Sequence, residues 1–275
     1  MRPARRAALV ALAGALLAPP PAARAELSPD RERFCSLLRH CGLPEPNGWC
    51  AGAERKLTYD SERCADARRL NLQGVDTGSA LGYRLFQFLG ARYQVVFASQ
   101  GELDLSPPRL AFLVDDLPLA AKLLSHFQKT RYAAAYLDAE HRRFSCSRGD
   151  ALTAEAERVL GSPALGRVEY FGSGQSQVGP WALKGLALLQ ATLWPAPGGH
   201  RVAYRVRVVS SPANAAVNAV MKGSLFRSLV ERYVRDTLDD ITQAAGRLQS
   251  KGLADPPPDW TPEDRKKLAE FLRLP

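Results

Sequence analysis

The stretch that decides the fold is Arg201-Val-Ala-Tyr-Arg-Val-Arg-Val-Val-Ser210, followed directly by Ser211-Pro212 and a long amphipathic segment. In this run the even positions from 202 to 208 are apolar and the odd positions carry three arginines, which is the period of a half-buried strand. Ser211-Pro212 supplies an N-cap and a first-turn proline, and both favour helix initiation. Across Ala213–Leu248 apolar residues recur at three- and four-residue steps. This pattern predicts a helix about 54 Å long that bends at Gly223, with a gripping part over Ser224–Leu248.

Six strand-like runs lead up to this helix without another helix between them. Their connections are short and polar or contain glycine, as hairpins require, so we expect an antiparallel meander. The runs are Tyr132–Leu137, Arg142–Ser147, Ala151–Val159, Arg167–Ser173, Trp181–Trp194 and Arg201–Ser210. Upstream, Tyr93–Ser99 is a candidate strand or the end of a preceding helix, and two short helices are expected between Pro107 and Phe127.

Several residues expected on the inner face of this sheet are small, namely Ala154, Ala156, Gly185, Ala187 and Ala191. Two outcomes stay open. The long helix lies close and fills the space, or a cavity for an apolar ligand remains.

The first residues of the chain predict export. A basic stretch, Met1–Arg6, precedes an apolar run, Ala7–Ala18, and a small-x-small site, Ala23–Ala25. This order is typical of a cleavable signal peptide over residues 1–25, with an uncleaved anchor as the alternative, and it predicts a periplasmic or secreted protein. Removal of this segment takes away four arginines and no acids, so the formal net charge falls from +9 to +5. So mild a charge does not indicate nucleic-acid binding, although it permits peripheral contact with an anionic membrane surface.

Four of the five cysteines, Cys35, Cys41, Cys50 and Cys64, lie close together in residues 26–90. In an exported protein they predict two disulfides, and of the three connectivities we favour Cys35–Cys64 with Cys41–Cys50. A zinc site is the alternative, but the segment has no C-x-x-C and only His40 nearby. Helical periodicity and caps predict helices here, so residues 26–90 are expected to form a helical, disulfide-bearing extension.

No catalytic or metal site emerges from the sequence. Gly172–Gly179 lacks the lysine of a phosphate loop and the last glycine of a nucleophile elbow centred on Ser176, so a flexible hairpin loop is expected there. Cys146 with His141 or His126 is a conceivable nucleophile and base, but the cysteine falls on the inward face of a strand. The adjacent carboxylates Asp115-Asp116 and Asp239-Asp240 do not converge. We expect no catalytic residue, no metal and no cofactor.

The order of elements resembles a known superfamily. A first strand, two short helices, six antiparallel strands and a long C-terminal helix is similar to the helix-grip order of the START-like superfamily, which includes polyketide-cyclase-like and lipid-transfer proteins. The local likeness lies in Ser211-Pro-Ala-Asn-Ala-Ala-Val-Asn218, in Leu225-Phe226-Arg-Ser-Leu229-Val230 and in Leu119–Phe127. It covers roughly residues 91–249 and leaves residues 26–90 without a counterpart. In residues 250–275, Pro256-Pro257-Pro258 predicts a linker, and the cap at Thr261 predicts a last short helix.

The resemblance implies an α+β helix-grip fold whose cavity, between the curved sheet and the C-terminal helix, holds a lipid or other hydrophobic small molecule. It carries over no catalytic residue. A cyclase- or hydrolase-type enzyme using the same cavity, or an interaction module with a filled core, are the alternatives, and the oligomeric state is left open. The expected lining residues are Tyr170, Trp181, Leu183, Tyr204, Val206, Met221, Leu225, Phe226 and Leu229.

Overall fold

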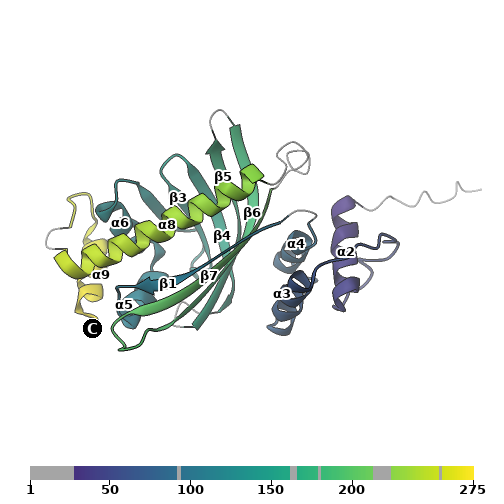
Figure 1. Ribbon diagram of the computed structural model, residues 1–275, viewed down its shortest axis with the longest axis horizontal. Helices are drawn as coiled ribbons and strands as arrows, with labels where there is room; N and C mark the ends of the chain where they lie inside the picture. The colour runs from purple at the N-terminus through teal and green to yellow at the C-terminus, as the bar shows by residue number, and fades with distance from the viewer. Residues whose placement is uncertain (1–27, 92–93, 162–165, 179–180, 213–223, 254–255) are drawn as a thin grey trace, which may run out of the picture.

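The computed structural model describes residues 28–91, 94–161, 166–178, 181–212, 224–253 and 256–275. Within these residues the chain is an α+β protein built on one antiparallel sheet of seven strands, crossed by a long helix (Figure 1). The strands are β1 (Val95–Leu103), β2 (Tyr132–Tyr136), β3 (Arg143–Arg148), β4 (Leu152–Gly161), β5 (Gly166–Val178), β6 (Trp181–Pro195) and β7 (Val202–Pro212). The described helices are α2 (Pro29–Cys41), α3 (Ser61–Leu72), α4 (Ala80–Leu89), α5 (Pro107–Asp115), α6 (Leu117–Phe127), α8 (Ser224–Lys251) and α9 (Pro262–Arg273).

The sheet order is β1-β7-β6-β5-β4-β3-β2, so the first strand pairs with the last and the others form a meander. All six neighbouring pairs are antiparallel, and α8 packs its apolar side chains on the inner face. This confirms the helix-grip fold, the six predicted strands and the gripping helix from Ser224. The preceding segment, with the predicted bend at Gly223, lies outside the described residues.

The prediction that Ser211 and Pro212 begin the long helix was wrong, because the pairing of β7 with β6 continues to Pro212. Local sequence signals do start other helices. Ser28 caps α2 by accepting a hydrogen bond from the Arg31 backbone, and Gly42 ends the helix in the left-handed region at φ 67°. Ser79 caps α4 and Asp116 caps α6 in the same way. Each of these contacts joins residues three positions apart, so a local sequence pattern is enough to predict it.

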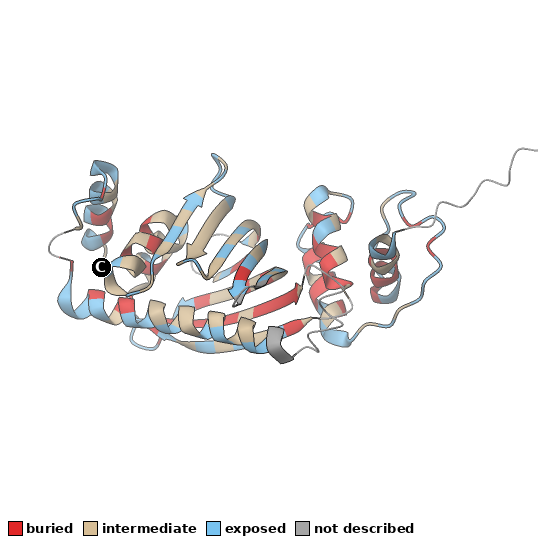
Figure 2. Cartoon of the chain, turned by 90° about the horizontal axis from the view of Figure 1, so that it is seen from above, coloured by how far each residue is buried: buried red, intermediate tan, exposed pale blue. Residues whose placement is uncertain are grey.

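Part of the sheet is buried on both faces, which the alternating pattern of Arg201–Ser210 did not indicate. On the inner face, side chains of β6 and β7 pack with α5, α6, α8 and α9. On the outer face, Phe171, Leu188 and Val209 pack against α2, α3 and α4, which lie at one end of the molecule in Figure 1. Figure 2 shows buried residues in both the sheet and these N-terminal helices. The prediction of a solvent-facing outer side for β7 was therefore wrong at its C-terminal half, because residues 28–91 cover it.

A buried charged network joins the N-terminal helices to the outer face of the sheet. The Glu169 side chain is 0% exposed and accepts hydrogen bonds from Arg69 Nη1 at 2.5 Å and pairs with Arg167 Nε at 2.7 Å. Nearby, Arg207 Nη1 donates to Asp66 at 2.6 Å, so an arginine of the predicted exposed series is part of this interface. Buried charges are tolerated only when paired, and these pairs fix where α3 docks on β5 and β7.

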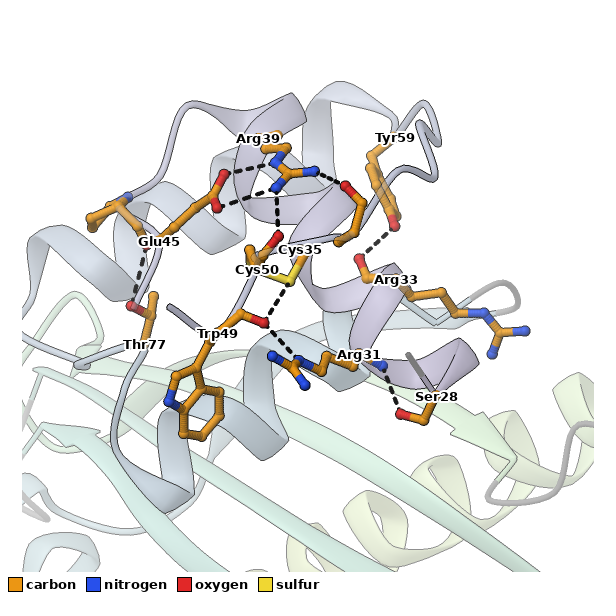
Figure 3. The surroundings of a disulfide bond; sticks show 12 residues. Ser28, Arg31, Arg33, Cys35, Arg39, Glu45, Trp49, Cys50, Tyr59 and Thr77 are labelled. Atoms are coloured by element: carbon orange, nitrogen blue, oxygen red, sulfur yellow. Dashed lines mark hydrogen bonds and ion pairs between the residues drawn. A yellow bond between two sulfur atoms is a disulfide. The ribbon is translucent and has the colours of Figure 1, made fainter. Parts of the chain in front are cut away.

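The four clustered cysteines form two disulfides, but the favoured pairing was wrong. The bonds are Cys35–Cys50 and Cys41–Cys64, with Cα atoms 5.5 and 5.1 Å apart. The turn before Cys50 folds back along α2 and is held there by the Arg39 guanidinium, which donates to Glu45 and to the Cys50 carbonyl (Figure 3). Cys41, at the end of α2, is then left facing α3. These long-range contacts decide the pairing.

The glycine-rich run Gly172–Gly179 is not a hairpin loop, because the described part, through Val178, is the second half of β5. The glycines are needed because β4 comes close: a Cβ on Gly172 would lie 2.2 Å from the Glu155 carbonyl oxygen. Residues 179 and 180 lie outside the described residues.

The C-terminal helix α9 closes one end of the inner core. Trp260, Leu268 and Phe271 are buried together with α5, α6 and α8. Lys267 Nζ pairs with Asp116 Oδ2 at 2.8 Å, and Lys122 pairs with Asp264. The predicted short helix is therefore confirmed, and it also contributes to the core. None of the described helices has the length and apolar character needed to cross a membrane.

Candidate ligand cavity

A cavity of about 340 Å³ lies between the inner face of β3–β7 and α8. Its floor is set by the sheet register, which lines up small residues in two rows across three strands. One row is Ala154–Gly174–Gly185 and the other is Ala156–Gly172–Ala187. Because hydrogen atoms and methyl groups stand where larger side chains would fill the space, the sheet and helix stay apart over these rows. The long helix therefore does not fill the space over the small residues, and a cavity remains there.

Bulkier side chains form the walls and roof of this cavity. The Tyr170 and Phe144 rings meet edge to face at a centroid distance of 5.4 Å. Leu183, Leu189 and Val208 complete the sheet side. The helix α8 contributes the roof, formed by Leu229, Val230, Tyr233 and Val234. The Tyr233 hydroxyl donates to the Ala151 carbonyl at 3.3 Å, which ties the helix to the start of β4.

The predicted lining residues divide into three groups. Tyr170, Leu183 and Leu229 line the cavity. The side chains of Trp181, Leu225 and Phe226, and all of Met221, lie outside the described residues.

Tyr204 and Val206 face inward but do not line this cavity, so the structure corrects their predicted role. They lie in the filled part of the inner core. The Tyr204 ring lies over Gly101 of β1, its partner in the register, where a Cβ on the glycine would come within 2.8 Å of the hydroxyl. Alternation along β7 correctly predicted that these two side chains face inward. Whether an inward side chain meets the cavity or the filled core depends on β1 and on the helices packed at that point of the strand.

The cavity also contains polar groups that the sequence analysis did not predict. Ser176 and Ser210 both line it, are 7% and 3% exposed, and carry hydroxyl oxygens without a hydrogen-bond partner among the described residues. Both serines continue the series of inward-facing positions of β5 and β7, and this alternation was the sequence signal that could have placed them in the cavity. Sequence periodicity located the face of each serine but not its lack of a partner.

Burial favours the neutral form of two titratable groups of the cavity. It raises the pKa of the Tyr170 hydroxyl from 10.0 to about 12, and it raises the pKa of the Cys146 thiol above 9.0. A thiol with a raised pKa is a poor nucleophile at neutral pH. Among the described lining residues Glu155 is the one with a charged side chain, and it is an exposed residue of β4. The arrangement therefore suits binding of an uncharged molecule better than acid–base or nucleophilic chemistry.

A metal centre is not apparent in the part of the chain that the structure describes. No group of three or more His, Cys, Asp or Glu side chains there is placed to hold an ion.

Comparison with protein-family models finds no match, and comparison with curated proteins finds none either. Comparison with solved structures finds similarities at low identity. The chain is similar to Ara h 8.0201 (11% identity, TM-score 0.42, covering 58% of this chain and 100% of that one). It is similar to a conserved protein of Geobacillus kaustophilus (13% identity, TM-score 0.40, covering 56% of this chain and 97% of that one). It is also similar to the di-domain ARO/CYC StfQ of the steffimycin biosynthetic pathway (20% identity, TM-score 0.35, covering 56% of this chain and 46% of that one). The helix-grip assignment rests on this chain's own strand order and long helix.

Proposed function

We propose that this chain is an exported binding protein that holds a hydrophobic small molecule in the cavity between its sheet and α8. The observation that carries the proposal is the pair of small-residue rows under α8, Ala154–Gly174–Gly185 and Ala156–Gly172–Ala187. An empty apolar space of about 340 Å³ costs stability through lost packing contacts, and a ligand would restore those contacts.

Export is part of the proposal. Two disulfides, Cys35–Cys50 and Cys41–Cys64, are typical of proteins that fold in an oxidising compartment. A secretory signal over residues 1–25 accords with this location.

The two alternatives have less support. An interaction module with a filled core would not need small residues in register beneath the helix. A cyclase- or hydrolase-type enzyme would need a charged or activated group inside, and the described lining offers hydroxyls and a protonated thiol.

The test is to fill the cavity and measure what the protein retains. The mature protein is purified without detergent and examined by native mass spectrometry, with organic extraction of any bound molecule. Ala154→Phe places a ring over the small-residue floor, so the bound mass present in the parent protein should be lost while the fold is kept. Ala135→Phe is the matched control, because Ala135 is exposed on β2.

Loss of the ligand in Ala154→Phe, together with an unchanged or raised melting temperature, would support the proposal, since filling an empty space adds packing contacts. The bare polypeptide in every preparation, combined with no response to added apolar probes, would refute it.

A further inference from the structure

We propose that the ligand is an uncharged, elongated apolar molecule that carries an oxygen group near each end, one for Ser176 and one for Ser210. The inference rests on the proposed binding function and adds the chemical class of the ligand. Two observations carry it: the two unpartnered serine hydroxyls and the distance between them.

Ser176 and Ser210 are the two described residues with a buried side-chain polar atom that has no partner. Burying a hydroxyl without a hydrogen bond is unfavourable, and native proteins rarely keep such groups without a reason. Both hydroxyls belong to residues of the same cavity, where alanine would satisfy packing equally well. A ligand hydroxyl or carbonyl would give each of them its missing partner.

The register sets how far apart the two partners must be. Ser176 lies opposite Leu183 of β6, and Ser210 lies opposite Ala187, four residues further along the same strand. Four residues correspond to about 13 Å along a strand and two strand spacings to about 10 Å, so the serines are about 16 Å apart. The small-residue rows occupy the surface between them, so the middle of the ligand is apolar.

The charge of the described lining argues against an anionic ligand. None of the described lining residues is a lysine, arginine or histidine, so a carboxylate end would be buried without a counter-ion. Ser176 and Ser210 can each donate or accept, which suits an alcohol, ketone, ester or amide oxygen.

The test compares three probes of equal chain length by isothermal titration calorimetry on the mature protein freed of bound molecules. The probes are dodecane-1,12-diol, whose oxygens can span about 16 Å, dodecan-1-ol with one oxygen, and dodecanedioate with two charges. We expect the diol to bind about five- to tenfold more tightly than the mono-alcohol, as one additional hydrogen bond to an unpaired group would give. The dicarboxylate should bind more weakly than both.

Variants assign the effect to the serines. Ser210→Ala and Ser176→Ala should each lower diol affinity to the level of the mono-alcohol. In the ligand-free protein neither should lower the melting temperature, because the lost hydroxyl has no partner. Ser145→Ala, on the outer face of β3, is the control and should leave all three affinities unchanged.

The outcomes separate this inference from the binding function. Equal affinity for diol and mono-alcohol, tighter binding of the dicarboxylate, or marked destabilisation of the ligand-free serine variants would overturn the inference while the cavity remains a binding site. Failure of all three probes to bind would overturn the inference and count against the proposed function as well.

Discussion

Replacing Glu169 with alanine should undock the N-terminal helices from the sheet. In the native protein Glu169 is fully buried on the outer side of β5 and faces Arg69 of α3 and Arg167 of its own strand. Gln190 Nε2 also lies 3.4 Å from its carboxylate. Without the carboxylate, Arg69 keeps only Asp66 and Gln73 as acceptors, and the interface loses its central anion.

The expected magnitude follows from how well the remaining groups can reach water. Removing one partner of a buried ion pair costs about 3–5 kcal/mol when the other charge stays buried. The side chains of Arg69 and Arg167 are 20% and 40% exposed, so they can be partly hydrated after the change. We therefore expect the lower limit, about 3 kcal/mol, which corresponds to a fall in melting temperature of about 6–12 °C for a chain of this size.

The assay is urea unfolding followed by circular dichroism, combined with hydrogen exchange read peptide by peptide. Glu169→Ala should lower the free energy of unfolding and increase exchange in α3. Glu155→Ala is the matched control: the residue is a glutamate on the neighbouring strand β4, but it is exposed, and its removal should change stability by less than about 0.5 kcal/mol. In the double variant Arg69→Ala/Glu169→Ala the loss should be smaller than the sum of the single losses, since the two residues share one interaction.

The reasoning would be refuted if Glu169→Ala behaved like Glu155→Ala, or if exchange in α3 stayed unchanged. Either result would mean that residues 28–91 are held on the sheet by the apolar contacts of Phe171, Leu188 and Val209 alone.

Two further predictions concern the cavity. Gly172→Ala should destabilise the protein by about 1–3 kcal/mol, because its Cβ meets the Glu155 carbonyl at 2.2 Å, whereas Gly246→Ala, in open space on α8, should stabilise it by up to about 1 kcal/mol. Equal melting temperatures for these two variants would contradict the close approach of β4 and β5. Burial raises the pKa of Tyr170 from 10.0 to about 12, so the folded state favours the neutral phenol. The contribution of the neutral Tyr170 to stability is therefore complete below pH 10 and is lost as the pH rises from 10 to 12. An absorbance titration of the parent protein minus Tyr170→Phe should show this late ionisation, and a difference centred at pH 10 would disprove it.

The sequence by itself determined the elements and their order. Alternation predicted all six strands of the meander, and periodicity with caps predicted the helices of residues 26–90 and the two between Pro107 and Phe127. These signals work because a cap bond or a strand period involves residues only a few positions apart. The same alternation placed Ala154, Ala156 and Ala187 on the inner face, which is why a cavity could be considered at all.

Only the tertiary structure decided which small residues lie next to one another, which cysteines pair and what covers the outer face. Local sequence predicts a loop at Gly172 because glycine is typical of loops, whereas the close approach of the β4 backbone is what requires a glycine there. Cys41 pairs with Cys64 because α2 and α3 meet there, and Arg207 is half-buried because α3 brings Asp66 to it. Each of these outcomes depends on contacts between residues far apart in the chain, and local periodicity holds no information about such contacts until the fold brings the partners together.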